Sequence, residues 1–326
     1  MLLLFSCRSS PFDVDISDIS IHQKFIRLDQ ELYHSQINGI QELHEHLTDT
    51  YPNAYKEYYE NILRIGPIED SMSVAGLNDM LQQKIWQKVQ GQIDSVFLDD
   101  AQLRAEFNKA FKYFKYHFPE EKVPDIVAMN TGLNYAIYPI EGQLGIGLEF
   151  YLGKEHWITK GLPVENFPNY QKHKMDRDHL LGDALRGYLL STKQKQIQGR
   201  QLINHVIYQG KIMYILNALL PYEDEHLQMG YTEEQLEWCY KNEFNLWRSI
   251  IEEDLVYSTN LKQIERFTGF GPFTQGFPKE SPGMISLFLG KQIVKDHMEK
   301  NEGKKLPELL YKTPDMLILK NYKPNK

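Results

Sequence analysis

The longest apolar stretch of the chain, Leu202 to Tyr222 (LINHVIYQGKIMYILNALLPY), carries hydrophobic side chains on every side of a helix. A helix of this kind is stable in a soluble domain only when all of its faces are buried. Pro221 cannot continue a helix, so we predict a buried central helix that ends just before it. His205, Gln209 and Lys211 are polar exceptions within this helix.

Lys211 needs a partner inside the protein, because an unpaired ammonium group in an apolar interior is costly. We predict that one of three carboxylates supplies it: Asp176, Asp183 or Glu243. Gln209 is the second buried polar side chain of this helix for which we expect a structural role.

The rest of the pattern predicts further helices and a small sheet. Apolar and acidic residues alternate from Phe12 to Ile21, as in a half-buried strand that leads into the core. Further strands are expected at residues 124–130, 134–139 and 144–152, and further helices at residues 25–47, 103–118 and 170–190. Residues 281–298 are expected to be a loop that enters a buried helix. Because strands and helices do not alternate regularly, this order indicates an α+β fold.

The helix after Gly230 has the clearest amphipathic pattern. Thr232 and Gln235 match a capping box at its start. Apolar residues then recur every three or four positions, which predicts one buried stripe made of Leu236, Tyr240, Phe244, Trp247, Ile251 and Leu255.

Composition agrees with a folded protein. The chain of 326 residues is 42% hydrophobic and 25% charged, an ordinary globular balance without a linker or an internal repeat. We therefore expect a mostly helical α+β protein with a small central sheet. Residues 1–12 would be a signal remnant and lipoprotein tether, and residues 13–326 a single globular domain.

The charge pattern excludes one large class of partner. The formal net charge is −8 at pH 7, whereas a protein that binds nucleic acid needs a concentrated basic surface. A G-x-S-x-G nucleophile motif is absent, and residues 269–276 (GFGPFTQG) lack the lysine and hydroxyl residue of a phosphate-binding loop. We expect neither a nucleic-acid partner nor a cofactor.

Cys7 follows the apolar run MLLLFS, as the cysteine of a bacterial lipoprotein signal does. We predict lipid attachment at Cys7, with palmitate among its acyl groups, and a membrane anchor. A signal normally includes about 7–15 apolar residues, and only six residues precede Cys7. Either the native start lies upstream or the match arose by chance. The second cysteine, Cys239, falls in a helical stretch and is expected to be buried.

The predicted strands, the helix at residues 170–190 and the buried helix resemble the helix and strand order of zincin-type zinc metallopeptidases. Those enzymes bind zinc through H-E-x-x-H on a helix. The corresponding helix here reads HKMDRDHLLGD, without that motif, and Gln209 stands where a carboxylate ligand is expected. A weaker metal site of His179, Asp183 and His205 is the alternative, since histidine and carboxylate suit zinc.

Several motifs together resemble the gliding motility lipoprotein GldB family of Bacteroidota. Besides Cys7 they are IRLDQELY (Ile26–Tyr33), YQGKIMYILNALLP (Tyr208–Pro221), GYTEEQLEWCYKNEFNLWRSIIEEDLVYST (Gly230–Thr259), FGPFT (Phe270–Thr274), SPGMISLFLGKQIVKDHM (Ser281–Met298) and KNYKP (Lys320–Pro324). The resemblance spans nearly the whole chain. It implies a lipid-anchored cell-envelope protein facing the periplasm, needed for gliding and associated with type IX secretion.

The resemblance also implies a degenerate relative of zinc peptidases, and it transfers no catalytic residue. We therefore expect a noncatalytic protein that acts through contacts with other envelope or motility proteins. His156, Trp157 and residues 269–276 are candidates for the contact surface. The alternative function is that of a divergent, zincin-like, metal-dependent hydrolase.

Overall fold

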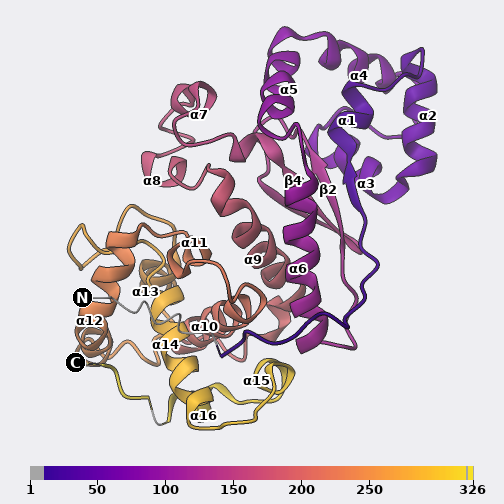
Figure 1. Cartoon of the computed structure of the whole chain (residues 1–326). Helices are drawn as coiled ribbons and strands as arrows, with labels where there is room; N and C mark the ends of the chain where they lie inside the picture. Colours follow the sequence, from indigo (N-terminus) through magenta and orange to yellow (C-terminus); the bar gives the residue numbers. More distant parts are fainter. Residues whose placement is uncertain (1–10, 321, 326) are drawn as a thin grey trace, which may run out of the picture. The chain divides into compact units, whose positions relative to one another are not determined.

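The computed structural model describes residues 11–320 and 322–325, without the side chain of Lys195. These residues divide into two compact units. Unit 1 comprises residues up to Ser20, residues 110–121 and the chain from Thr192 onward; unit 2 comprises residues 21–109 and 122–191. Helix α6 (Ala101–His117) contributes residues to both (Figure 1). The single domain expected over residues 13–326 stays a prediction.

Unit 2 is built on a mixed sheet with the strand order β1-β2-β4-β3. Strands β1 (Phe25–Arg27), β2 (Asp125–Met129) and β4 (Gln143–Gly147) run parallel, and β3 (Ile137–Ile140) pairs antiparallel with β4. Gly147 is needed in β4, because an added Cβ would collide with the Tyr135 carbonyl oxygen. Three of the strands expected from the sequence are therefore present.

Most helices of unit 2 bury apolar side chains, whereas α8 buries none. The helices of this unit are α1 (Leu28–Tyr33), α2 (Ile40–Thr50), α3 (Pro52–Lys56), the π-helix η1 (Glu57–Ile62), α4 (Ser73–Gln82), α5 (Lys84–Val96), the 3₁₀ turns η2 (Leu148–Tyr151) and η3 (Arg177–His179), α7 (Trp157–Gly161), α8 (Asn169–Lys172) and α9 (Leu180–Lys193). Tyr55, Tyr58 and Tyr59 are fully buried in the core beside the sheet.

Unit 1 is helical. Its elements are the 3₁₀ turn η4 (Gln194–Gln196), α10 (Leu202–Leu219), α11 (Glu225–Met229), α12 (Glu233–Glu252), α13 (Leu261–Thr268), α14 (Ser286–Glu299), α15 (Leu306–Tyr311) and α16 (Asp315–Leu319). The sequence predicts α10 to within one residue, and most of its side chains are buried. The small mixed sheet and the many helices confirm the α+β class. Across residues 11–320 and 322–325, no helix is long and apolar enough to cross a membrane.

Four local predictions are wrong. The expected helix at residues 25–47 begins as strand β1 and is then divided into α1 and α2. Residues 12–21 form no strand; they alternate between exposed and partly buried positions without pairing to the sheet. The expected strand at residues 144–152 ends at Gly147, where the chain turns into η2. The expected helix at residues 170–190 is divided into α8, η3 and α9.

The buried stripe of α12 is also different from the predicted one. The capping box of Thr232 and Gln235 is present. The residues buried on this helix, however, are Cys239, Glu243, Leu246 and Ile250, whereas Tyr240, Phe244 and Ile251 of the predicted stripe are exposed. The periodicity identified the helix correctly, and the face that packs lies one residue earlier in the sequence.

Candidate functional site

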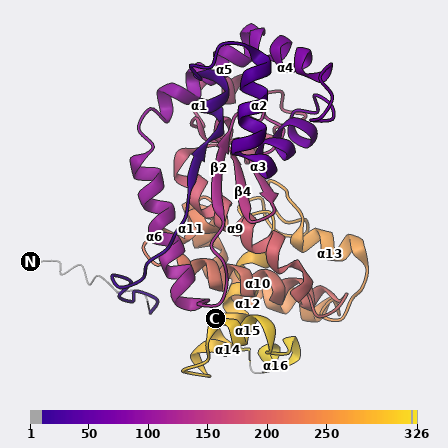
Figure 2. The same ribbon diagram turned by 90° about the vertical axis from the view of Figure 1, so that its right-hand side faces the viewer.

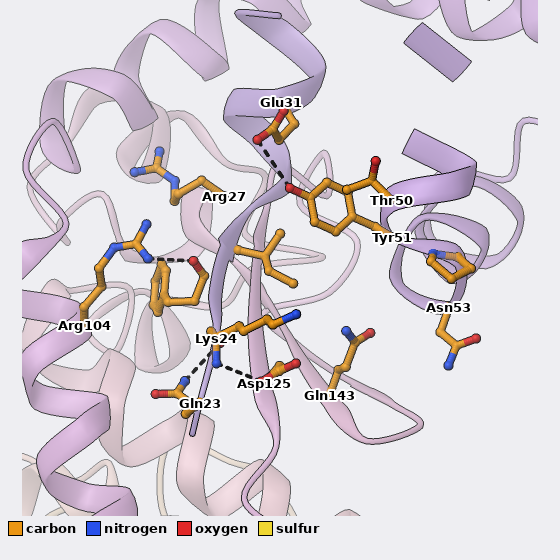
Figure 3. A pocket seen from close by; sticks show the side chains of 13 residues that line it. Gln23, Lys24, Arg27, Glu31, Thr50, Tyr51, Asn53, Arg104, Asp125 and Gln143 are labelled. Carbon is orange, nitrogen blue, oxygen red and sulfur yellow. Dashed lines mark hydrogen bonds between the residues drawn. The ribbon is translucent and has the colours of Figure 1, made fainter. Parts of the chain in front are cut away.

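A surface hollow of about 740 Å³ in unit 2 lies along β1, where β1, β2 and β4 begin. We call it the β1 hollow. Its lining comprises residues 23–27, Glu31, residues 50–53, Arg104, Asp125 and Gln143 (Figure 3). Pro52 starts α3, which brings Tyr51 and Asn53 to the wall of the β1 hollow.

Both arginines of the β1 hollow already hold carboxylates. Arg27 donates two hydrogen bonds to Asp29, at 2.8 and 2.7 Å. Arg104 donates two to Asp100, at 2.6 and 2.8 Å. Such bidentate pairs fix the guanidinium groups and satisfy much of their charge. The two arginines therefore form part of the wall of the β1 hollow, and their positive charge is largely neutralised before any anionic ligand binds.

The floor of the β1 hollow is the edge of the sheet. The Phe25 carbonyl accepts a 2.6 Å hydrogen bond from Arg104 Nη1, so the main-chain groups of Phe25 face away from β2. Edge strands offer such groups to an added strand, but here Arg104 already occupies the Phe25 carbonyl. Beside this edge, the Lys24 side chain is exposed and pairs with no carboxylate among the described residues (Figure 3). The β1 hollow is thus a polar surface in which Lys24 lies near the Glu31 and Asp125 carboxylates.

A buried carboxyl group lies at the opposite ends of the same strands. Glu149, in η2 directly after β4, has no exposed surface. Its Oε1 accepts hydrogen bonds from the N–H and hydroxyl groups of Thr131 and, at 2.8 Å, from the N–H of Leu133. No described residue bonds to its Oε2. Burial raises the pKa of Glu149 to about 7, although its hydrogen bonds oppose the shift.

We predict that Glu149→Gln removes a pH dependence of stability. The ordinary pKa of a glutamate is about 4.3, so between that pH and about pH 7 the folded chain holds a proton that the unfolded chain has released. The free energy of unfolding should therefore fall by about 3 kcal/mol as the pH rises through this window. Glutamine keeps the accepting oxygen and has no such transition. Urea unfolding across this pH range measures the difference, and the same pH slope in both proteins would contradict it.

The three residues proposed as metal ligands lie in different surroundings. His179 is buried with its ring edge-on to His173, 5.8 Å between centroids. Asp183 accepts a 3.0 Å hydrogen bond from Arg186. Burial lowers the pKa of His205. Residues 11–320 and 322–325 contain no group of three or more His, Cys, Asp or Glu side chains placed to hold a metal ion. His205 belongs to unit 1, and His179 and Asp183 belong to unit 2, so a joint site of the three stays a prediction.

Lys211 is buried, but its partner differs from all three predicted carboxylates. Its ammonium lies 3.0 Å from Asp315 Oδ1 and donates a second hydrogen bond, of 3.1 Å, to the Thr313 carbonyl. Asp176, Asp183 and Glu243 are therefore the wrong assignments. The amide oxygen of Gln209, which is partly buried, has no partner among the described residues.

The other residues predicted to have a functional role are Cys7 and those of the proposed contact surface. Cys7 lies outside the described residues. His156 caps α7, and Trp157 is 47% exposed with the Lys88 ammonium 4.0 Å from its ring centre. Within residues 269–276, Phe270 is exposed, while Thr274 is buried and donates to the Pro282 carbonyl. The contact surface proposed from these residues stays a prediction.

Comparison with known proteins identifies the family. The family model described as gliding motility protein GldB matches residues 9–324. The chain belongs to this family. A search of curated proteins and a search of solved structures each gave no match. The match covers both compact units, so the β1 hollow and the buried Glu149 both lie within the region shared with the GldB family.

Sequence reasoning missed the β1 hollow and Glu149. The lining of the β1 hollow comes from segments up to about 120 residues apart. Lys24 and Asp125, for example, meet where the Lys24 N–H donates a 2.8 Å hydrogen bond to the Asp125 carboxylate. One usable signal was present: Asp125 and Gln143 are polar residues at the starts of two predicted strands. Nothing in the local sequence marks Glu149 as buried.

Proposed function

We propose that this member of the GldB family is a noncatalytic, lipid-anchored protein of the cell envelope that faces the periplasm. It supports gliding motility and the associated type IX secretion through contacts with other envelope or motility proteins. Family membership over residues 9–324 supports the motility role. The lipoprotein-like sequence before Cys7 supports the anchor.

The observation that carries the proposed contact is the geometry of the β1 hollow. Its lining is built from the amino ends of parallel strands, whereas the catalytic groups of parallel sheets gather at the carboxyl ends. It combines an edge strand, arginines fixed by carboxylates and the exposed Lys24. These features suit a polar segment of a partner protein that places an acidic side chain near Lys24.

We predict that Lys24→Glu impairs gliding while the protein still folds. In a strain that lacks the chromosomal gene, the native chain should restore the spreading of colonies. The Lys24→Glu chain should restore it poorly, because the reversed charge repels an acidic partner segment. Spreading on agar is the measurement, with immunoblots to confirm equal amounts of each chain in the envelope.

Lys84→Glu is the matched control, since Lys84 is an exposed lysine of the same unit outside the β1 hollow. This chain should restore spreading as well as the native one. A deletion strain that spreads normally would contradict the motility role. Full restoration by Lys24→Glu would contradict the use of the β1 hollow.

A further inference from the structure

The first described residues of the chain are fixed to unit 1. The ring of Phe12 meets two aromatic rings edge-on, His117 at 6.1 Å and Tyr214 at 5.2 Å between centroids. The next residue, Asp13, accepts a 3.3 Å hydrogen bond from the Tyr113 hydroxyl. Figure 2 shows this segment beside the carboxyl end of α6. The chain that follows the amino-terminal residues is therefore packed on a defined face of unit 1, the face around Phe12.

This packed segment is close to the proposed lipid along the chain. Only four residue steps separate Cys7 from Pro11. A fully extended chain covers at most about 3.6 Å per step, so Cys7 can lie no more than about 14 Å from Pro11. If the Cys7 acyl groups are inserted in a bilayer, the face around Phe12 must border that bilayer.

The side chains of this face suit a membrane interface. Phe12 lies in a hollow of about 840 Å³ that also contains Tyr116, Tyr311, Lys305, Leu306 and Pro307, which we call the amino-terminal hollow. Tyr116 is 48% exposed and Tyr311 40% exposed, and Lys305 is exposed beside them. Tyrosine and lysine are favoured at the level of lipid headgroups, because each has an apolar body and a polar tip.

Electrostatic attraction to anionic lipid is not the main feature of this face. Glu121 in the amino-terminal hollow already accepts hydrogen bonds from Lys193 and from the Tyr311 hydroxyl. Lys304 lies 3.7 Å from the Glu308 carboxylate. Glu120 in the same hollow is exposed and acidic, so the tyrosines and the apolar stem of Lys305, rather than net positive charge, are the features of this face that suit headgroups.

We propose that the face of unit 1 around the amino-terminal hollow lies against the lipid bilayer to which the chain is anchored. This inference rests on the anchor at Cys7 in the proposed function. It adds a defined surface and orientation: Tyr116, Tyr311 and Lys305 sit in the headgroup layer, and α12 faces away from it. Figure 1 shows α12 and α15 on opposite sides of α14.

Two single-label chains test this orientation. Lys305→Cys places a thiol at the amino-terminal hollow, and Lys241→Cys places one on exposed α12 of the same unit. Cys239 is fully buried and Cys7 is acylated in the mature chain, so a fluorescent maleimide reacts at the introduced cysteine. Each labelled, full-length lipoprotein is reconstituted on vesicles of phosphatidylethanolamine and phosphatidylglycerol that contain a spin-labelled lipid.

We expect the label at position 305 to be quenched several-fold more strongly than the label at position 241. Equal quenching, or stronger quenching at position 241, would overturn the orientation while leaving the anchor intact. Mass spectrometry of the amino-terminal peptide and flotation of the vesicles test the anchor separately. An unacylated chain that does not float would overturn both the anchor and the orientation.

Discussion

Asp315→Ala should destabilise the protein by about 3–5 kcal/mol, because it leaves the Lys211 ammonium buried without its counter-charge. Lys211 is fully buried and Asp315 nearly so. Asp315 also accepts a 2.9 Å hydrogen bond from Asn204, so one carboxylate joins α16 to two positions on α10. Losing it removes one of the polar contacts that hold α16 on the central helix. Urea unfolding followed by circular dichroism measures the loss.

The double substitution Lys211→Met with Asp315→Leu should lose less stability than Asp315→Ala alone. Removing both charges together leaves no unpaired ion, and such replacements are often nearly neutral. Asp296→Ala is the matched control in unit 1. Its pair with Lys300 is partly exposed, so its removal should cost less than about 1 kcal/mol. If Asp315→Ala and Asp296→Ala lose similar stability, the buried pair contributes less than we infer.

Gly210→Ala should destabilise the protein by more than about 3 kcal/mol, at the upper end for overpacking. Gly210 lies on α10 where that helix crosses α14, and an added Cβ would overlap the carbonyl group of Gly290. Gly290 is equally constrained by the Val206 carbonyl. The obstruction is main chain on both sides, so rotation of a side chain cannot relieve it. The two central helices of unit 1 would have to separate.

Gly91→Ala is the control for this prediction. Gly91 lies on the exposed side of α5, with no atom within 4 Å of an added Cβ. Alanine should stabilise a helix there by about 0.5–1 kcal/mol, because glycine loses more conformational freedom on folding. Thermal unfolding of both variants distinguishes the two effects. A Gly210→Ala protein as stable as the native one would contradict the close crossing of α10 and α14.

The elements with the strongest local signal were predictable. Leu202 to Tyr222 is apolar on every side, and no arrangement other than full burial hides such a helix from water, so α10 lies as expected. Thr232 and Gln235 make their reciprocal hydrogen bonds, since a capping box depends on residues only three apart.

Predictions that depended on a distant partner failed more often. On α12, two neighbouring faces carry apolar residues, and the rest of unit 1 decided that Leu246 and Ile250 are buried rather than Phe244 and Ile251. The segment at residues 12–21 alternates like a strand, but a strand also needs a neighbour to pair with. Its Phe12 packs against His117 and Tyr214 instead.

The candidate site was the least predictable part. The sequence analysis predicted that Lys211 requires a carboxylate partner, because an ammonium group buried in an apolar helix is costly without one. Its partner, Asp315, is 104 residues further along the chain, in a helix whose sequence gives no sign of the contact. The β1 hollow could not be predicted for the same reason, because its lining residues are far apart in the sequence. They come from the starts of strands, the start of a helix and an arginine of α6.

The sequence by itself thus determined the family, the α+β class, the burial of α10 and the need for a partner at Lys211, because each follows from local pattern or from a direct energetic requirement. The tertiary structure alone decided that Asp315 is the partner, which stripe of α12 is buried, and that Glu149 lies in the interior. These outcomes depend on which distant segments meet, and the free energy of packing selects among alternatives that local sequence leaves equivalent.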